Sequence, residues 1–208
     1  MGLIGCFSLA DSNVVELGGP TMGTEWRISL GTQNAAQSEL IATDSALRQA
    51  IVSGVETELV RINQLMSTWD PKSELSLFNT NLTTEHIRWH SDALKVLQTA
   101  LDVSRATNGS YDVTRGRVFE LWGFSANAAD VSAPSAAQLD LALSTSGWRA
   151  VNVGSGGVAK RHSDLAIDLS SLAKGFAVDQ LGAVLESFGM QHYVVTVSYT
   201  HLTLPTKA

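Results

Sequence analysis

The densest group of polar residues in the sequence is the run Asp168-Leu169-Ser170-Ser171-Leu172-Ala173-Lys174-Gly175. It reads as a strand that ends in a carboxylate, followed by a helix that begins with hydroxyls. The N–H groups at a helix start are unpaired and attract anions, and Lys174 adds a positive charge one turn later. The run therefore predicts a phosphate-binding site. Asp168 would repel bare phosphate, so we interpret it as a base, as a partner for a hydroxyl or ribose, or as a neighbour of a hard cation.

The same run also has a purely structural interpretation, in which a serine caps the helix and the lysine faces solvent. Familiar nucleotide-binding and hydrolytic motifs are absent from the sequence. A Walker loop needs a glycine directly before its lysine, whereas Lys174 precedes Gly175. No Rossmann fingerprint is present, and no serine has the setting of a catalytic triad.

Three further residues are candidates for binding. Asp112 follows the Asn108-Gly109 helix stop, where an aspartate on its own is more often a turn residue. Trp69 and Trp122 are either core residues or platforms on which a planar ring stacks.

Composition excludes several classes of protein. The chain has 208 residues, and 44% of them are hydrophobic, which is enough for a packed core. Its formal net charge is −6, which argues against a basic surface that binds nucleic acid. No apolar run approaches the roughly 20 residues of a membrane-spanning helix. The single cysteine, Cys6, follows Leu3-Ile4-Gly5, which resembles the end of a bacterial lipoprotein signal whose earlier part is missing. The alternative is a free cysteine in a frayed N-terminus.

Hydrophobic periodicity predicts an α+β architecture in which long amphipathic helices accompany a mixed or antiparallel sheet. The expected helices cover about 44–66, 92–106, 135–147 and 171–188, and a shaped loop follows the first of them at 67–71. The expected strands cover 21–30, 150–153, 157–160, 165–169 and 192–197, with a short extended piece at 110–114 and a hairpin turn at 154–157. The valines of 192–197 predict a strand that is buried on both faces.

Four ordered segments together resemble the ApbE family, the FAD:protein FMN transferases: Thr21–Trp26, Ser67–Asn79, Tyr111–Phe124 and Asp168–Asp179. The resemblance implies a T-fold-like domain over about residues 20–197, which is only the N-terminal part of the family domain. It also implies a reaction in which FAD is split at its pyrophosphate with the help of Mg²⁺. FMN is then joined by a phosphoester to a threonine of a target protein, typically a membrane redox subunit of the Nqr or Rnf type.

Carried over position by position, the resemblance gives roles to eight residues. Asp168 lies at the FAD and reaction centre, Ser171 gives an oxygen to the Mg²⁺ ion, and Lys174 meets FAD. The remaining matches to FAD-contacting positions are Met22, Trp69, Ser110, Tyr111 and Asp112.

The sequence departs from the family pattern in two places. Arg115-Gly116-Arg117 replaces an apolar residue, glycine and proline, and the two added cations are expected to tighten anion binding or change the acceptor. From Ser198 the expected Gly-Gly turn and the distal Asp and Thr cation ligands are missing. We therefore expect an N-terminal segment at 1–19, a partial flavin transferase domain at 20–197 and a non-family tail at 198–208. We expect this incomplete chain to be inactive alone, because its polar tail lacks both the ligands and the neighbouring strands that the last buried strand requires.

Two alternatives remain open for the function. The same site with water as acceptor is an FAD pyrophosphatase that releases FMN and AMP, and a chain that lacks its cation ligands is a non-catalytic flavin-binding module. A purely structural role predicts no FAD binding at all. Many family members are exported and lipid-anchored, which favours the lipoprotein interpretation of Cys6 and a place at the periplasmic side of the bacterial inner membrane.

Overall fold

The computed structural model of the chain describes residues 14–31, 39, 41, 43, 45–124, 133–198 and 200–203. It forms two compact units, Met1–Glu58 with Val178–Ala208, and Leu59–Ala177. Helices α2 (Ala46–Met66) and α7 (Ser170–Ser187) each contribute residues to both units. The candidate signal at Cys6 lies outside the described residues.

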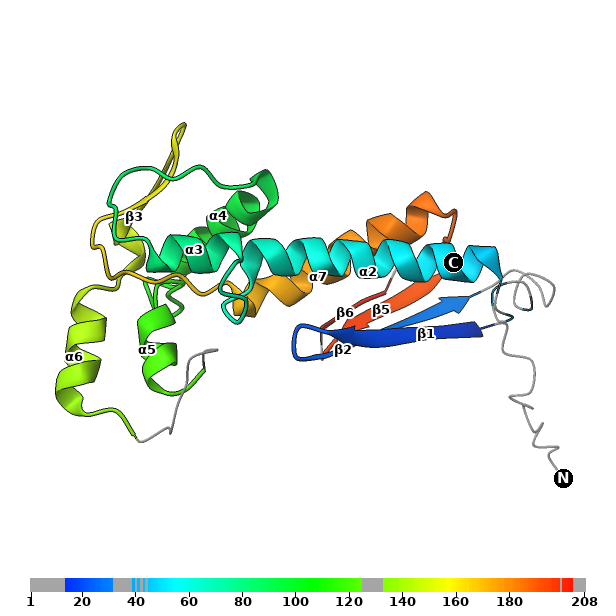
Figure 1. The fold of residues 1–208 in the computed structure, drawn as a ribbon, viewed down its shortest axis with the longest axis horizontal. Helices are drawn as coiled ribbons and strands as arrows, with labels where there is room; N and C mark the ends of the chain where they lie inside the picture. The colour runs from blue at the N-terminus through cyan, green and yellow to red at the C-terminus, as the bar shows by residue number, and fades with distance from the viewer. Residues whose placement is uncertain are drawn as a thin grey trace, which may run out of the picture. The chain divides into compact units, whose positions relative to one another are not determined.

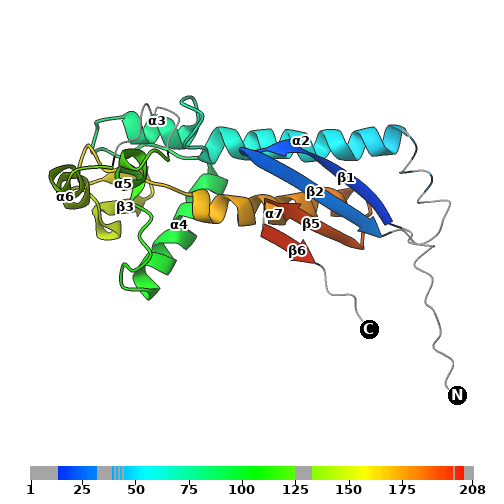
Figure 2. The same ribbon diagram turned by 90° about the horizontal axis from the view of Figure 1, so that it is seen from below.

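The first unit is built on a four-stranded antiparallel sheet of order β1-β2-β5-β6. Its strands are β1 (Val14–Thr21), β2 (Thr24–Gly31), β5 (Tyr193–Val197) and β6 (Thr200–Thr203). Every second residue of β2 faces the core, and Trp26, Ile28 and Leu30 are all fully buried. Figures 1 and 2 show the parts of α2 and α7 that belong to this unit on one face of the sheet. Gly54 of α2 packs against Phe188 at the end of α7.

A tight hairpin joins β1 to β2. Met22 and Gly23 form the turn, with positive φ angles of 48° and 72°, as a two-residue type I′ turn requires. The strand predicted at 21–30 is therefore confirmed in β2, whereas β1 was not predicted, because Gly18-Gly19-Pro20 is a poor strand sequence. Met22, one of the expected FAD contacts, lies at this turn of the first unit.

Two expectations about the C-terminal strand are wrong. β5 is not buried on both faces, because Val194 is 38% exposed while Val195 and Val197 are fully buried. Residues after Val197 do supply a neighbouring strand, since β6 pairs with β5 from Thr200 opposite Val197 to Thr203 opposite Val194. β5 thus has partners on both edges, β2 and β6.

The second unit is mainly helical. Besides parts of α2 and α7 it contains α3 (Glu74–Thr80), α4 (Ser91–Ala106), α5 (Gly116–Leu121), α6 (Ala136–Ser144), a short 3-10 helix (Trp148–Ala150) and the hairpin of β3 (Val151–Gly154) and β4 (Gly157–Lys160). The predicted helices α2, α4, α6 and α7 and the predicted hairpin are all confirmed. Ser135 caps α6 in a capping box with Gln138. α4 ends at Ala106, and Asn108 and Gly109 after it both have positive φ.

Other local predictions for this unit are wrong. Residues 165–169 form no strand and make only one parallel bridge, between Arg115 and Ala166. Residues 110–114 form turns instead of an extended piece. The short helices α3 and α5 were not predicted, because one or two turns of helix leave little periodic signal.

The α+β class with antiparallel sheets is confirmed. None of the helices that the structure describes is both long and apolar enough to cross a bilayer.

Candidate active site

A cavity of about 520 Å³ lies within the second unit, and Asp168 forms part of its wall. Asp168 immediately precedes Leu169 and the start of α7. Its backbone N–H donates to the Val113 carbonyl over 2.9 Å. Its carboxylate accepts the backbone N–H of Ser170 over 2.7 Å and also the Ser170 hydroxyl. The half-buried carboxylate is thus held at the cavity by the chain on both sides of it.

The predicted anion site at the start of α7 is partly occupied by the protein itself. The Asp168 carboxylate accepts a hydrogen bond from the Ser170 N–H. The N–H groups of Leu172 and Ala173 donate to the Leu169 carbonyl over 3.0 and 2.8 Å. Fewer backbone donors are therefore left for a phosphate than the sequence indicated. A ligand phosphate would depend correspondingly more on Lys174.

A second pair of predicted residues meets beside Asp168. The Tyr111 hydroxyl lies 2.8 Å from the Ser171 hydroxyl, a hydrogen bond between residues 60 positions apart in the sequence. Burial raises the pKa of Tyr111, the bond to Ser171 lowers it, and the negative charges of Asp168 and Asp112 raise it further. Tyr111, Asp112, Asp168 and Ser171 therefore lie close enough to influence one another electrostatically, while the roles that the resemblance gives them remain predictions.

Asp112 organises the turn that precedes α5. Its side chain is only 5% exposed, and Oδ1 accepts the backbone N–H and the hydroxyl of Thr114 at 3.0 and 2.7 Å. Thr114 Oγ1 in turn accepts the Gly147 N–H over 2.6 Å. The structure thus gives Asp112 a turn-forming role, which is the alternative that the sequence left open. Ser110 precedes it on the same turn and is exposed.

Lys174 and Trp69 remain available to a ligand. Lys174 is half-buried, and within the described part of the chain its ammonium has neither a hydrogen-bond nor an ion-pair partner. Trp69 is 59% exposed on the loop after α2, next to Thr68 of the cavity wall. Trp122 at the end of α5 is 46% exposed. Neither tryptophan is therefore a core residue, and a stacking role for either ring remains a prediction.

The two arginines that depart from the family pattern have partners inside the protein. Arg115 donates to the Ser146 hydroxyl over 2.8 Å and lies 3.6 Å from Asp112. Arg117 donates to Glu120 over 2.6 Å and to the Asp164 carbonyl over 3.1 Å. These contacts argue against the expectation that both cations add to anion binding.

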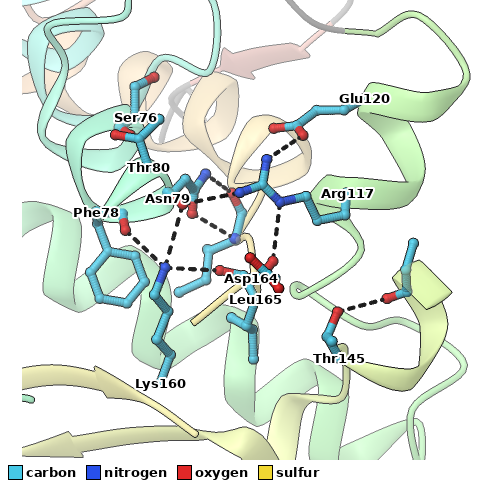
Figure 3. Close-up of polar contacts among 12 residues, drawn as sticks. Ser76, Phe78, Asn79, Thr80, Arg117, Glu120, Thr145, Lys160, Asp164 and Leu165 are labelled. Atoms are coloured by element: carbon cyan, nitrogen blue, oxygen red, sulfur yellow. Dashed lines mark hydrogen bonds and ion pairs between the residues drawn. The ribbon is translucent and has the colours of Figure 1, made fainter. Parts of the chain in front are cut away.

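Sequence reasoning missed a polar network that includes part of the cavity wall (Figure 3). Asn79, which is 6% exposed, donates from Nδ2 to the Ile167 carbonyl and accepts the Ile167 N–H at Oδ1, each over 2.8 Å. The side chain thus replaces the neighbouring strand that residues 165–169 lack. The signal was the asparagine that directly follows the largely apolar run Leu75–Phe78, but a sequence does not show which backbone groups such an amide binds.

Lys160 is the other missed residue. It is the last residue of β4 and is 2% exposed. Its Nζ donates to the carbonyl oxygens of Phe78, Asn79 and Leu165 over 3.1, 3.4 and 3.3 Å. The pKa of Lys160 is lowered from 10.5 to about 8, mainly by burial and also by the positive charge of Arg117, while the negative charge of Asp164 acts in the opposite direction.

Comparison with known proteins gives a consistent picture. The profile of the ApbE family matches residues 22–201. Two FAD:protein FMN transferases are similar in sequence, from Vibrio cholerae (31% identical over 196 residues, 94% of this chain and 55% of the relative) and Haemophilus influenzae (32% over 198 residues, 90% and 53%). This chain therefore spans about half the length of these relatives.

Solved structures agree with the sequence comparison. The flavin transferase ApbE from Vibrio cholerae matches with a TM-score of 0.82 at 29% identity, over 91% of this chain and 59% of that one. The flavinyl transferase ApbE from Pseudomonas stutzeri, in its apo form, matches with a TM-score of 0.78 at 22% identity, over 92% and 58%, which bears on the fold alone.

Proposed function

Because the chain belongs to the ApbE family, we propose that it acts as an FAD:protein FMN transferase. The observation that carries this proposal is Asp168 at the wall of a cavity, close to the hydrogen-bonded pair Tyr111 and Ser171. Lys174 lies one turn after Ser171 on α7 and has no partner among the described residues. A carboxylate, an ammonium and hydroxyls close together are the groups that phosphoryl-type transfer requires, because catalysis there depends on positioning and on charge stabilisation.

In the proposed reaction, the hydroxyl oxygen of an acceptor threonine attacks the FMN phosphorus of FAD. The new bond joins that oxygen to phosphorus, the pyrophosphate P–O bond breaks, and AMP leaves with the electron pair. Asp168 accepts the hydroxyl proton as a general base. Lys174 stabilises the negative charge on the phosphate oxygens. Trp69 offers an exposed ring on which a planar part of FAD stacks.

The proposal includes a divalent cation, Mg²⁺. No cluster of three or more His, Cys, Asp or Glu side chains suited to a metal occurs among the described residues. Mg²⁺, however, commonly binds through one or two protein oxygens together with water and substrate phosphates. The hydroxyl of Ser171 fits that mode by donor type, and the negative charge of Asp168 nearby would favour a cation there. A bound Mg²⁺ would neutralise charge on the pyrophosphate.

The test is incubation of the protein, expressed from its genomic reading frame, with FAD, Mg²⁺ and a threonine-bearing acceptor peptide. We expect flavin fluorescence to stay with the peptide after denaturation, together with one AMP released per flavin transferred. The same peptide with alanine for threonine is the control. Free FMN and AMP without labelled peptide would instead establish a pyrophosphatase, and FAD binding without AMP would establish a flavin-binding module.

We further propose that the acceptor is a membrane redox subunit of the Nqr or Rnf type, and that the protein is lipid-anchored at the periplasmic side of the inner membrane. Cys6, which follows a lipobox-like run, supports this location. Radiolabelled palmitate should enter the protein in bacterial cells and should not enter the Cys6→Ser variant. Absence of label from both proteins would contradict the anchor.

A further inference from the structure

The segment 164–168 brings Asp168 to the cavity, although it belongs to neither a helix nor a strand. Contacts on two sides hold it. On one side the Gly116 N–H donates to the Ala166 carbonyl over 3.2 Å, and Asp168 N–H donates to Val113. On the other side lie the Asn79 amide and the Lys160 ammonium. The position of Asp168 therefore depends on these isolated backbone bonds and on two side chains, and not on a continuous sheet.

Lys160 is the most unusual of these holding groups. An ammonium carries three donors, and three carbonyl oxygens, those of Phe78, Asn79 and Leu165, surround it within 3.4 Å (Figure 3). Its Nζ also lies 5.1 Å from the centre of the Phe78 ring. Lys160 thus joins the end of α3 to the beginning of the segment that carries Asp168.

No carboxylate within the described residues forms an ion pair with this buried ammonium. The charged groups that act on it are Arg117, which is paired with Glu120, and the exposed Asp164. Burying a charge without a direct counter-ion is costly, and the backbone carbonyls and the Phe78 ring offset that cost here. An apolar side chain of similar length would avoid the cost of burying a charge but would leave these carbonyls without their donor, so the specific property of a lysine here is that it binds them.

We propose that Lys160 is a positioning residue that fixes Asp168 for catalysis by holding the segment 164–168 against the end of α3. This inference rests on the proposed function. Without the ammonium, the Phe78 and Leu165 carbonyls lose the only donors that the described structure gives them, whereas the Asn79 carbonyl keeps Arg117 at 3.3 Å. The segment then moves to hydrate its carbonyls, and Asp168 moves with it.

The test compares Lys160→Met with Lys95→Met, a control at an exposed lysine of α4, in the protein expressed from its genomic reading frame. Three quantities are measured: kcat for FMN transfer, the Kd for FAD, and hydrogen exchange of the Ile167 amide by NMR. We expect Lys160→Met to lower kcat at least tenfold and to speed exchange of Ile167 at least tenfold. The Kd for FAD should stay within twofold, because Lys174 and Trp69 are unchanged. Lys160→Arg, which keeps a charged donor, should have a kcat at least threefold above that of Lys160→Met.

An unchanged kcat, or equal losses of kcat and FAD affinity, would overturn the positioning role and leave Lys160 as a structural residue only. Unchanged exchange of the Ile167 amide would overturn it as well. If Lys160→Met does not fold, Lys160→Gln, which retains an amide donor, takes its place in the same comparison. Absence of FMN transfer by the unmodified protein would refute the proposed function, while the exchange of Ile167 would still decide whether Lys160 holds the segment.

Discussion

Replacing Asn79 with leucine should destabilise the second unit strongly. The side chain is 6% exposed and makes two hydrogen bonds of 2.8 Å with the backbone of fully buried Ile167. Leucine has a similar shape but neither donates nor accepts, so the N–H and the carbonyl of Ile167 are left buried without partners. Each such group costs roughly 1–3 kcal/mol, so the expected loss in the free energy of unfolding is about 2–6 kcal/mol for the two groups.

The loss should be easy to measure, because the free energy of unfolding of a folded domain is only about 5–15 kcal/mol. The assay is urea unfolding followed by tryptophan fluorescence, with the slope m compared to check that the same surface is exposed. Asn81→Leu is the matched control two residues away, where the side chain is exposed and accepts only the Thr83 N–H over 2.9 Å. It should cost less than about 1 kcal/mol.

The backbone carbonyl of Asn79 still accepts from Arg117 and Lys160 in Asn79→Leu, so the experiment isolates the side-chain amide. A loss below about 1 kcal/mol, equal to that of Asn81→Leu, would refute the conclusion that this amide replaces a neighbouring strand for residues 165–169.

Four other predictions concern single residues. Asp168→Asn should lower kcat far more than FAD affinity, because it keeps the shape of the side chain but removes the basic charge; wild-type transfer would exclude Asp168 as the base. Lys174→Ala should weaken FAD binding by about 1–3 kcal/mol in a fluorescence titration, and unchanged affinity would show that Lys174 does not meet the ligand. Because the pKa of Lys160 is lowered from 10.5 to about 8, the unfolded chain binds more protons between these values, so stability should rise with pH. From pH 7.5 to 9.5 the unfolding free energy should increase by about 2 kcal/mol relative to Lys160→Met, and a parallel pH profile of the two proteins would contradict this. Gly157→Ala should cost at least about 2 kcal/mol in thermal unfolding, because φ is +117° and a Cβ would lie 2.1 Å from the Ile87 carbonyl oxygen; an unchanged Tm would be inconsistent with that contact.

Periodic elements could be predicted from the sequence because their signal repeats. The long helices α2, α4 and α7 each show several turns of apolar residues on one face. Helix ends were also marked by local chemistry, such as the capping serine Ser135 before α6 and the left-handed Gly109 after α4. The two-residue turn at Met22 and the segment 165–169 carried no such repeat, and both required the structure.

The candidate site divides in the same way. The run from Asp168 to Lys174 is contiguous, so its residue types alone indicated an anion or cation site at a helix start. Tyr111 entered only through the resemblance to a family, and its contact with Ser171 spans 60 residues. Asp112 could be interpreted as a ligand or as a turn residue until its bonds to Thr114 were seen.

The sequence by itself determined the α+β class, the long helices and the polar run at the start of α7, because each depends on interactions between residues close in the chain. Only the tertiary structure decided that Asn79 pairs with Ile167, 88 residues away, and that Lys160 binds carbonyls at the end of α3. The local sequence around an asparagine or a lysine does not show whether the side chain lies on the surface or in the core. Its partners are residues that are distant in the sequence and that only the folded chain brings together. A buried polar group without a partner is costly, so the folded arrangement is one in which these groups are paired.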